Sequence, residues 1–256
     1  MDDKKTLAFY TDGFLGMVTS TISFINPALG IAAMAVSPAV SMVIKEWLFK
    51  LVDNGSITQR EFSRLNEGLE GIIDTLKDKS STQTIRKDSL LKTNENGFCD
   101  ADDIFESMLN QIKIDSEKKK AYFYGNFVGS IPYASDLNYS NLMQYCHIIG
   151  KLSFSEICLL HNFYKYHRDK SVDFGKAELQ VKRGEDPDAS EILADILHLL
   201  NLGLLIKRAP YNSGELIGKV SLSFSGIRLY SLMRLHLLDI KDTNKTLRVL
   251  WSMTKG

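Results

Sequence analysis

The chain has 256 residues, 44% of them apolar, and its 31 Lys and Arg side chains balance its 31 Asp and Glu side chains. With only 17 Gly and 5 Pro, this composition excludes a disordered tail protein, a collagen-like or Pro-rich linker and a highly basic histone-like binder. The length is enough for one large domain or two small ones, each able to bury a core.

The net charge of zero is the sum of two oppositely charged halves. Residues 1–139 hold 15 basic and 19 acidic side chains, whereas residues 140–256 hold 16 basic and 12 acidic ones. Opposite net charges favour packing of the two halves or pairing of subunits.

The cysteines are few and irregularly spaced. Cys99, Cys146 and Cys158 stand at unrelated intervals, which predicts reduced thiols in a cytoplasmic setting and excludes a disulfide scaffold. Cys158 and His161 are one helical turn apart, but no Cys-x-x-Cys or His-Glu-x-x-His pair completes a ligand set. We therefore expect no metal and no other cofactor. The first five residues are not net positive, so no secretory signal is expected.

The most unusual segment runs from Gly13 to Ile44, thirty-two residues without one Asp, Glu, Lys, Arg or His. Pro27 and Pro38 divide it into shorter pieces. Residues 14–25 correspond to about 18 Å of helix, which is less than the roughly 30 Å hydrocarbon thickness of a bilayer. Three forms remain open: a kinked single span, a re-entrant hairpin that turns at Asn26 and Pro27, and a hydrophobic hairpin buried in protein until it is released.

We expect this segment to associate with membrane lipid, because a monomeric soluble domain seldom needs so long an uncharged stretch. Lys45, Trp47 and Lys50 follow it directly and are typical of an interfacial anchor. Small residues at three- and four-residue spacing favour close helix contacts, and the alternative is a buried core hairpin of a soluble oligomer. The apolar side chains expected to meet lipid are Phe14, Leu15, Ile22, Phe24, Ile25, Leu29, Ile31, Val36, Val40, Val43 and Trp47.

Two amphipathic helices are predicted in the middle of the chain. Leu65, Leu69, Ile72 and Leu76 recur at three- and four-residue steps, which predicts a helix over residues 57–79. Residues 80–97 are polar and without periodicity, so we expect an exposed loop there. A second helix is predicted over residues 100–114, with aspartates in the first turn, where the helix dipole favours anions.

A series of short motifs follows: E-x-K-K, then Y-G-N, an apolar helix, an Asn-containing helix, and Leu-Ser before another apolar helix. In chain order these motifs are carried by Glu117, Lys119, Lys120, Tyr124, Gly125, Asn126, Asn138 or Asn141, Leu152 and Ser153. Together with the Gly/Ala-rich N-terminus, they resemble a group of largely uncharacterised bacterial helical proteins, similar in outline to abortive-infection proteins of the Abi-alpha type. The resemblance implies a mostly helical protein of mobile-element or phage-defence context, and it brings no catalytic residue.

The Y-G-N motif is interpreted as a tight helix contact. Gly125 lacks the side chain that would hold a second helix away, while Tyr124 and Asn126 offer hydrogen-bonding groups at semi-buried positions. The alternative is that Tyr124 and Asn126 bind a ligand.

The C-terminal third follows the order of a winged helix. Ser153 caps a predicted helix, Ser190 opens another over residues 191–201, residues 204–207 and 219–224 resemble strands, and residues 227–238 form a last helix. A winged helix suggests DNA binding, but the predicted recognition helix offers Glu191 and Asp195, which repel phosphates. We therefore favour a partner protein over nucleic acid. The side chains left for either contact are Lys182, Arg183, Lys207 and Arg208.

Taken together, the sequence predicts a mostly α-helical protein in three parts. An apolar helical hairpin occupies residues 1–52, a helical bundle residues 53–150, and a winged-helix-like α+β domain residues 151–256. The hypothesis is a non-enzymatic, homo-oligomeric anti-phage effector of the bacterial cytoplasm whose N-terminal segment associates with and perturbs the inner membrane.

Two alternatives from other classes are kept. The first is a soluble oligomeric regulator that uses the winged helix to bind DNA or a partner protein. The second is an enzyme that uses the histidine-rich C-terminal part as a source of general bases, although no nucleophile stands at a telling spacing there.

Overall fold

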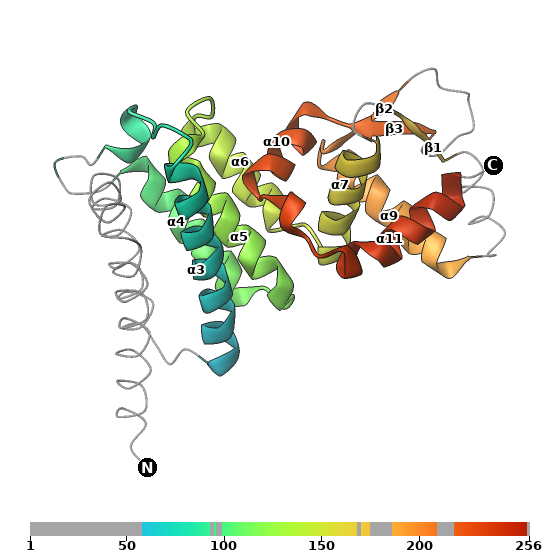
Figure 1. Cartoon of the computed structure of the whole chain (residues 1–256), viewed down its shortest axis with the longest axis horizontal. Helices are drawn as coiled ribbons and strands as arrows, with labels where there is room; N and C mark the ends of the chain where they lie inside the picture. The colour runs from blue at the N-terminus through green and yellow to red at the C-terminus, as the bar shows by residue number, and fades with distance from the viewer. Residues whose placement is uncertain are drawn as a thin grey trace, which may run out of the picture. The chain divides into compact units, whose positions relative to one another are not determined.

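The computed structural model describes residues 58–92, 95, 99–167, 170–174, 186–208 and 218–254. Within these residues the chain is mostly helical, with eight α-helices and one small three-stranded sheet (Figure 1). The expectation of a mostly α-helical chain is confirmed for this part. The predicted hairpin of residues 1–52 lies outside the described residues. Contacts divide the chain into two compact units, Met1–Cys146 and His147–Gly256, which are described separately.

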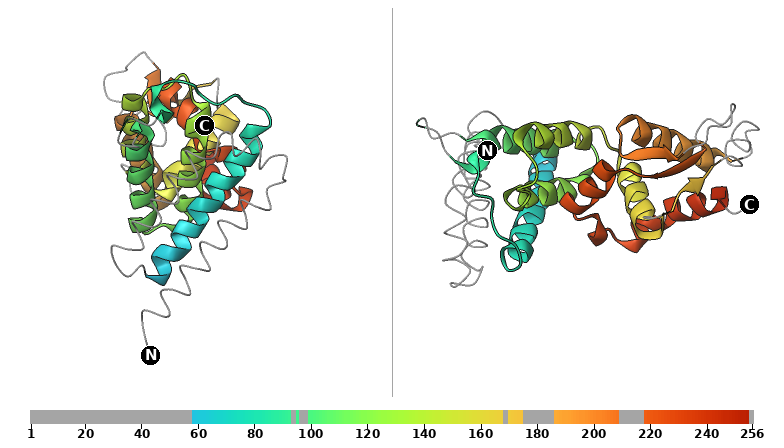
Figure 2. Two further views of the ribbon diagram at one scale, coloured as in Figure 1. Left: turned by 90° about the vertical axis from the view of Figure 1, so that its left-hand side faces the viewer. Right: turned by 90° about the horizontal axis from the view of Figure 1, so that it is seen from above.

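The described part of the first unit is built on three helices that all pack against one another (Figure 2): α3 (Gln59–Ser80), α4 (Asp100–Ile114) and α5 (Lys118–Ser130). The predictions of helices over residues 57–79 and 100–114 are confirmed to within two residues. Helix α4 buries Ile104, Met108 and Ile112 on one stripe, as its amphipathic pattern requires. A 3₁₀ turn (Ile131–Tyr133) then leads to α6 (Tyr139–Ile149), and the division between the two units falls within this helix, after Cys146.

The polar connection between α3 and α4 is not exposed throughout. A short 3₁₀ helix (Ser89–Leu91) interrupts it and buries Leu90. Arg86 is also buried, because its guanidinium donates to the Ala134 and Leu137 carbonyl oxygens at 3.0 and 2.7 Å. These hydrogen bonds tie the connection to the segment between α5 and α6.

The second unit surrounds one central helix, α7 (Phe154–His167), which buries eight consecutive residues from Glu156 to Phe163. Helices α9 (Pro187–Asn201), α10 (Phe224–Leu232) and α11 (Ile240–Thr254) pack against it, as does strand β3. A helix buried on most sides shows little hydrophobic periodicity. Here the start of α7 is set by Ser153 and Glu156, which cap each other.

The sheet is antiparallel in the order β1-β3-β2. The predicted strands are present as β2 (Leu205–Arg208) and β3 (Lys219–Leu222). The third strand, β1 (Val172–Asp173), was not predicted, because two residues carry no period-2 pattern.

Two helix boundaries differ from the sequence prediction. Helix α9 begins four residues before Glu191, because Asp186 accepts a hydrogen bond from the Ala189 amide and Pro187 fits the first turn. The single helix predicted over residues 227–238 is wrong: α10 ends at Leu232, and Arg234 adopts a left-handed conformation with φ of 52°. This turn redirects the chain through a 3₁₀ helix (Leu235–Leu237) into α11, which was not predicted.

Candidate functional site

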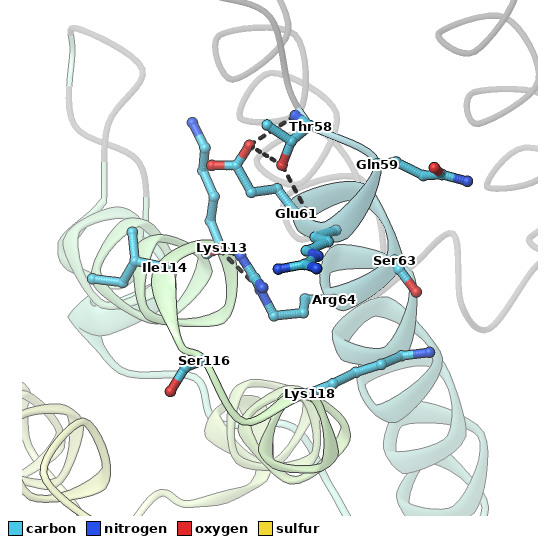
Figure 3. A pocket seen from close by; sticks show the side chains of 10 residues that line it. Thr58, Gln59, Glu61, Ser63, Arg64, Lys113, Ile114, Ser116 and Lys118 are labelled. Carbon is cyan, nitrogen blue, oxygen red and sulfur yellow. Dashed lines mark hydrogen bonds between the residues drawn. The ribbon is translucent and has the colours of Figure 1, made fainter.

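The candidate site is a surface depression of about 930 Å³ in the first unit, at the first turn of α3, the end of α4 and the start of α5 (Figure 3). Four of its lining side chains are basic and one is acidic, so its lining has a net charge of +3. The lining residues are Thr58, Gln59, Arg60, Glu61, Ser63, Arg64, Lys113, Ile114, Ser116 and Lys118.

The first turn of α3 holds the one acidic side chain in place. Glu61 Oε2 accepts hydrogen bonds from the Thr58 amide at 2.8 Å and from the Thr58 hydroxyl at 2.7 Å, while the Glu61 amide donates back to Thr58 Oγ1 at 3.3 Å. This is a capping box. The hydrogen bonds from Thr58 lower the pKa of the Glu61 carboxyl, so the group is ionised and turned towards the start of its own helix.

Arg64 fixes the end of α4 against α3. Its Nε donates to the Lys113 carbonyl oxygen at 3.0 Å, and its Nη2 donates to the same atom. That carbonyl is one of the last four of α4, which have no partner within the helix. Arg64 therefore satisfies an otherwise orphaned acceptor and positions Lys113 and Ile114 at the edge of the depression.

The turn from α4 to α5 is organised around Asp115. Its Oδ2 accepts from the Tyr124 hydroxyl at 2.7 Å and lies 2.5 Å from Lys120 Nζ, while its Oδ1 accepts from the Glu117 amide at 2.8 Å. Lys120 is 5% exposed and also pairs with Glu117 Oε2 at 3.2 Å. Burial and the Asp115 hydrogen bond raise the pKa of the Tyr124 hydroxyl above its usual range. Glu117 and Lys120 of the E-x-K-K motif therefore belong to a charge network at this turn.

The Y-G-N motif lies where α3 and α5 touch backbone to backbone. A Cβ added at Gly125 would lie 1.8 Å from the Gly68 carbonyl oxygen, and one added at Gly71 would lie 2.1 Å from the Tyr122 carbonyl oxygen. Asn126 Oδ1 accepts from the Thr75 hydroxyl at 2.9 Å. Tyr124 and Asn126 have no exposed surface, so the motif residues are packing residues in this structure.

Sequence reasoning pointed to Gly125 but not to the glycines it meets. The spacings Gly68-x-x-Gly71 in α3 and Gly125-x-x-x-Gly129 in α5 were the available signal, since small residues at such spacing let two helices approach closely. It also missed the depression, because Arg60, Arg64, Lys113 and Lys118 lie on three separate helices or turns.

The remaining predicted site residues are either outside the described part or on the sheet. All eleven proposed lipid-facing residues, Phe14 to Trp47, lie outside the described residues, as do Lys182 and Arg183. Lys207 and Arg208 are exposed on β2, where Arg208 stands opposite Lys219 and donates from Nε to Ser221 Oγ at 2.8 Å.

His161, His198 and Cys146 have surroundings that are explained by packing and hydrogen bonding within the fold. His161 Nδ1 lies 2.8 Å from the Leu235 carbonyl oxygen, and His198 Nδ1 is bonded to the buried carboxylate of Glu156. Burial raises the pKa of the Cys146 thiol to about 12, which keeps it protonated and unreactive. Within the described part of the chain, no group of three His, Cys, Asp or Glu side chains is placed to hold a metal ion.

Compared with known protein families, with curated proteins and with solved structures, the chain matches none. Among the helices that the structure describes, none is both long enough and apolar enough to cross a bilayer.

Proposed function

We propose that the protein is a non-enzymatic bacterial anti-phage effector of the abortive-infection type, active as a homo-oligomer at the inner membrane. The observation that carries the proposal is the uncharged segment Gly13–Ile44, which precedes the first described residue, Thr58, by thirteen residues. Charged side chains cost several kcal/mol, roughly 2.5–3.5 each, at the centre of a membrane helix. A stretch that contains none is therefore suited to contact with lipid.

The buried polar groups of the helical units have structural roles, and this supports the proposal. Asp115 pairs with Lys120, Thr75 donates to Asn126, and Glu156 accepts from Ser153 and contacts His198. These groups stabilise helix contacts and helix ends. Packed helices of this kind are suited to carrying the N-terminal segment, and the proposal needs no catalytic step or cofactor.

The test is flotation with vesicles of phosphatidylethanolamine and phosphatidylglycerol, combined with a phage-survival assay in cells. We expect the full chain to float with the vesicles, and Ile31→Asp/Val36→Asp to remain in the dense fraction, because two carboxylates oppose insertion. The matched control, Ile31→Ala/Val36→Ala, should still float. Full phage protection by a chain lacking residues 1–44, or a full chain that never floats, would refute the proposal.

A second candidate function is partner binding through a winged-helix-like second unit. The order α7, β1, α9, β2, β3 and the antiparallel sheet β1-β3-β2 favour this interpretation. Asp188 and Glu191 are exposed on α9, which would be the recognition helix. Acidic side chains there favour a basic protein partner over DNA.

A gel shift with nonspecific duplex DNA at low and moderate salt separates these partners. We expect weak DNA binding at both salt concentrations. The variants Lys182→Glu/Arg183→Glu and Lys207→Glu/Arg208→Glu should bind DNA about as weakly as the wild type. Tight binding that falls steeply with salt and is abolished by either pair of substitutions would instead assign the unit to DNA.

A further inference from the structure

We infer that the depression between α3, α4 and α5 is a binding site for a phosphate group. It goes beyond the proposed membrane association, because it concerns side chains of the described helices and holds for a free phosphate as well as for a lipid headgroup.

The available charges are positive. Among the described residues, the Arg60 guanidinium and the Lys113 ammonium line the depression and form no hydrogen bond or ion pair, although Lys113 is near enough to Glu61 to help lower the pKa of its carboxyl. Lys118 pairs with Glu67 at 3.0 Å, but both side chains are well exposed, and such surface pairs are worth about 1 kcal/mol or less. Lys118 can therefore turn to a stronger anion at little cost.

The nearby negative charges, in contrast, are engaged. Glu61 is held by Thr58, and Asp115 and Glu117 are both paired with the buried Lys120. The Lys113 carbonyl at the negative end of α4 accepts two hydrogen bonds from Arg64. With the ionised Glu61 carboxylate counted, the lining of the depression keeps a net charge of +3.

The chemistry of these groups suits a phosphate. A guanidinium binds a phosphate through two parallel hydrogen bonds, and an ammonium adds a compact charge, so the combination suits a tetrahedral, multiply charged oxyanion. The Ser63 and Ser116 hydroxyls supply further donors within the same lining. The first turn of α3 adds the positive end of a helix dipole to the cationic side chains.

The size and edge of the depression indicate what else the ligand carries. Its volume of about 930 Å³ exceeds that of a phosphate ion and lies within the range of small-molecule sites. Ile114, which is 68% exposed, places an apolar side chain beside the cations. Both features suit a phosphate attached to a larger group, and a glycerophospholipid headgroup is one source of this chemistry.

The experiment uses the full chain and two double variants with the same change in charge. Arg60→Gln/Lys113→Gln removes the two available cations, and neither side chain donates a hydrogen bond within the described part, so the fold should persist. Lys77→Gln/Lys87→Gln is the control, because both residues are exposed and lie beyond the depression, at the far end of α3 and in the following connection. Thermal unfolding followed by circular dichroism checks that both variants fold.

Two arms distinguish the sources of phosphate. In the first, calorimetry with inorganic pyrophosphate should show binding by the wild type and by the control. We expect the affinity of Arg60→Gln/Lys113→Gln to be lower by about tenfold or more, because one charge-assisted hydrogen bond contributes about 1.5–3 kcal/mol. In the second, vesicles of phosphatidylcholine are compared with vesicles that also contain phosphatidylglycerol. A gain from phosphatidylglycerol that is lost only in the site variant identifies a lipid headgroup.

The inference is overturned if the wild type shows neither pyrophosphate binding nor a gain from phosphatidylglycerol, or if both double variants lose binding equally. Either result leaves the membrane proposal standing, because attachment to neutral phosphatidylcholine vesicles through residues 13–44 is measured in the same second arm. Conversely, pyrophosphate binding without attachment to any vesicle refutes the membrane proposal alone.

Discussion

At the scale of single residues, two features hold the first unit together: a close contact between glycines and a buried charge pair. Gly125 and Gly68 allow the backbones of α5 and α3 to meet. In the turn before α5, Asp115 accepts a hydrogen bond from Tyr124 and forms an ion pair with Lys120. Gly125, Tyr124 and Lys120 belong to the motifs noticed in the sequence. Their roles here come from residues that no motif marked: Gly68 on another helix, and Asp115 in the turn before α5.

Replacing Gly125 by Ala should destabilise the first unit by about 3 kcal/mol, at the upper end of the usual cost of overpacking, because the new Cβ meets backbone that cannot move aside. Gly203→Ala is the control. Its Cβ would meet nothing within 4 Å, so only the left-handed backbone, with φ of 71°, is strained, at about 1 kcal/mol. Urea unfolding of both variants measures the difference, and equal losses would contradict the steric explanation.

Replacing Lys120 by Met should cost about 3 kcal/mol or more, because it leaves the Asp115 carboxylate in the interior without its cation. Lys118→Met removes a neighbouring lysine whose pair is exposed, and should cost less than about 1 kcal/mol. Adding Asp115→Asn to Lys120→Met should recover part of the loss in urea unfolding. No recovery in the double variant would show that packing of the lysine chain, rather than the charge pair, is what matters.

At the scale of elements, the sequence predicted most of the described helices but not all of them. Helix α4 has the predicted bounds because its buried stripe and acidic first turn are written in its own residues. Helix α11 was not predicted, and its buried side includes Thr243 and Thr246 beside Leu250 and Met253. The two threonines can be buried because Asn162 of α7 forms hydrogen bonds there: its Nδ2 donates to the Thr243 carbonyl oxygen and to Thr246 Oγ1.

The connection between α3 and α4 should loosen when Arg86 is changed. Arg86→Gln leaves the Ala134 and Leu137 carbonyls short of charged donors and frees Asp88, whose pKa Arg86 holds below its usual value. We expect a loss of about 2 kcal/mol and faster proteolysis within residues 81–92. The control Lys87→Gln, at the exposed neighbouring position, should change the stability and the rate of proteolysis only a little. Unchanged proteolysis in Arg86→Gln would show that Leu90 alone anchors the connection.

At the scale of the whole molecule, the two units should respond differently to mild acid. Burial lowers the pKa of both His161 and His167, which lie in the second unit. A lowered pKa means that the unfolded chain binds protons first, so this stability is complete above the unfolded value of about 6.5 and falls as the pH drops below it. The depressed carboxyl groups of Glu61 and Asp88 lie in the first unit and lose their contribution only at lower pH.

Hydrogen exchange between pH 7.5 and 5.5, corrected for intrinsic rates, measures this difference. Protection of α7 and α10 should fall, by up to about 1.4 kcal/mol per pH unit for each additional proton, while that of α3 and α5 changes less. His161→Gln should flatten the fall in α7, because glutamine keeps a donor for the Leu235 carbonyl without titrating. An equal fall in both units would mean that they unfold together.

Local sequence patterns were enough to predict the mostly helical character, the bounds of α3 and α4 to within two residues, the capped start of α7 and the uncharged segment Gly13–Ile44. Each of these depends on residues within a few turns of one another. Three contacts became visible only in the folded chain: Gly125 meets Gly68, Asp115 pairs with the buried Lys120, and cations from α3, α4 and α5 line one depression. The reason is that such contacts depend on how closely and at what rotation helices pack, which the local periodicity of a single helix does not specify.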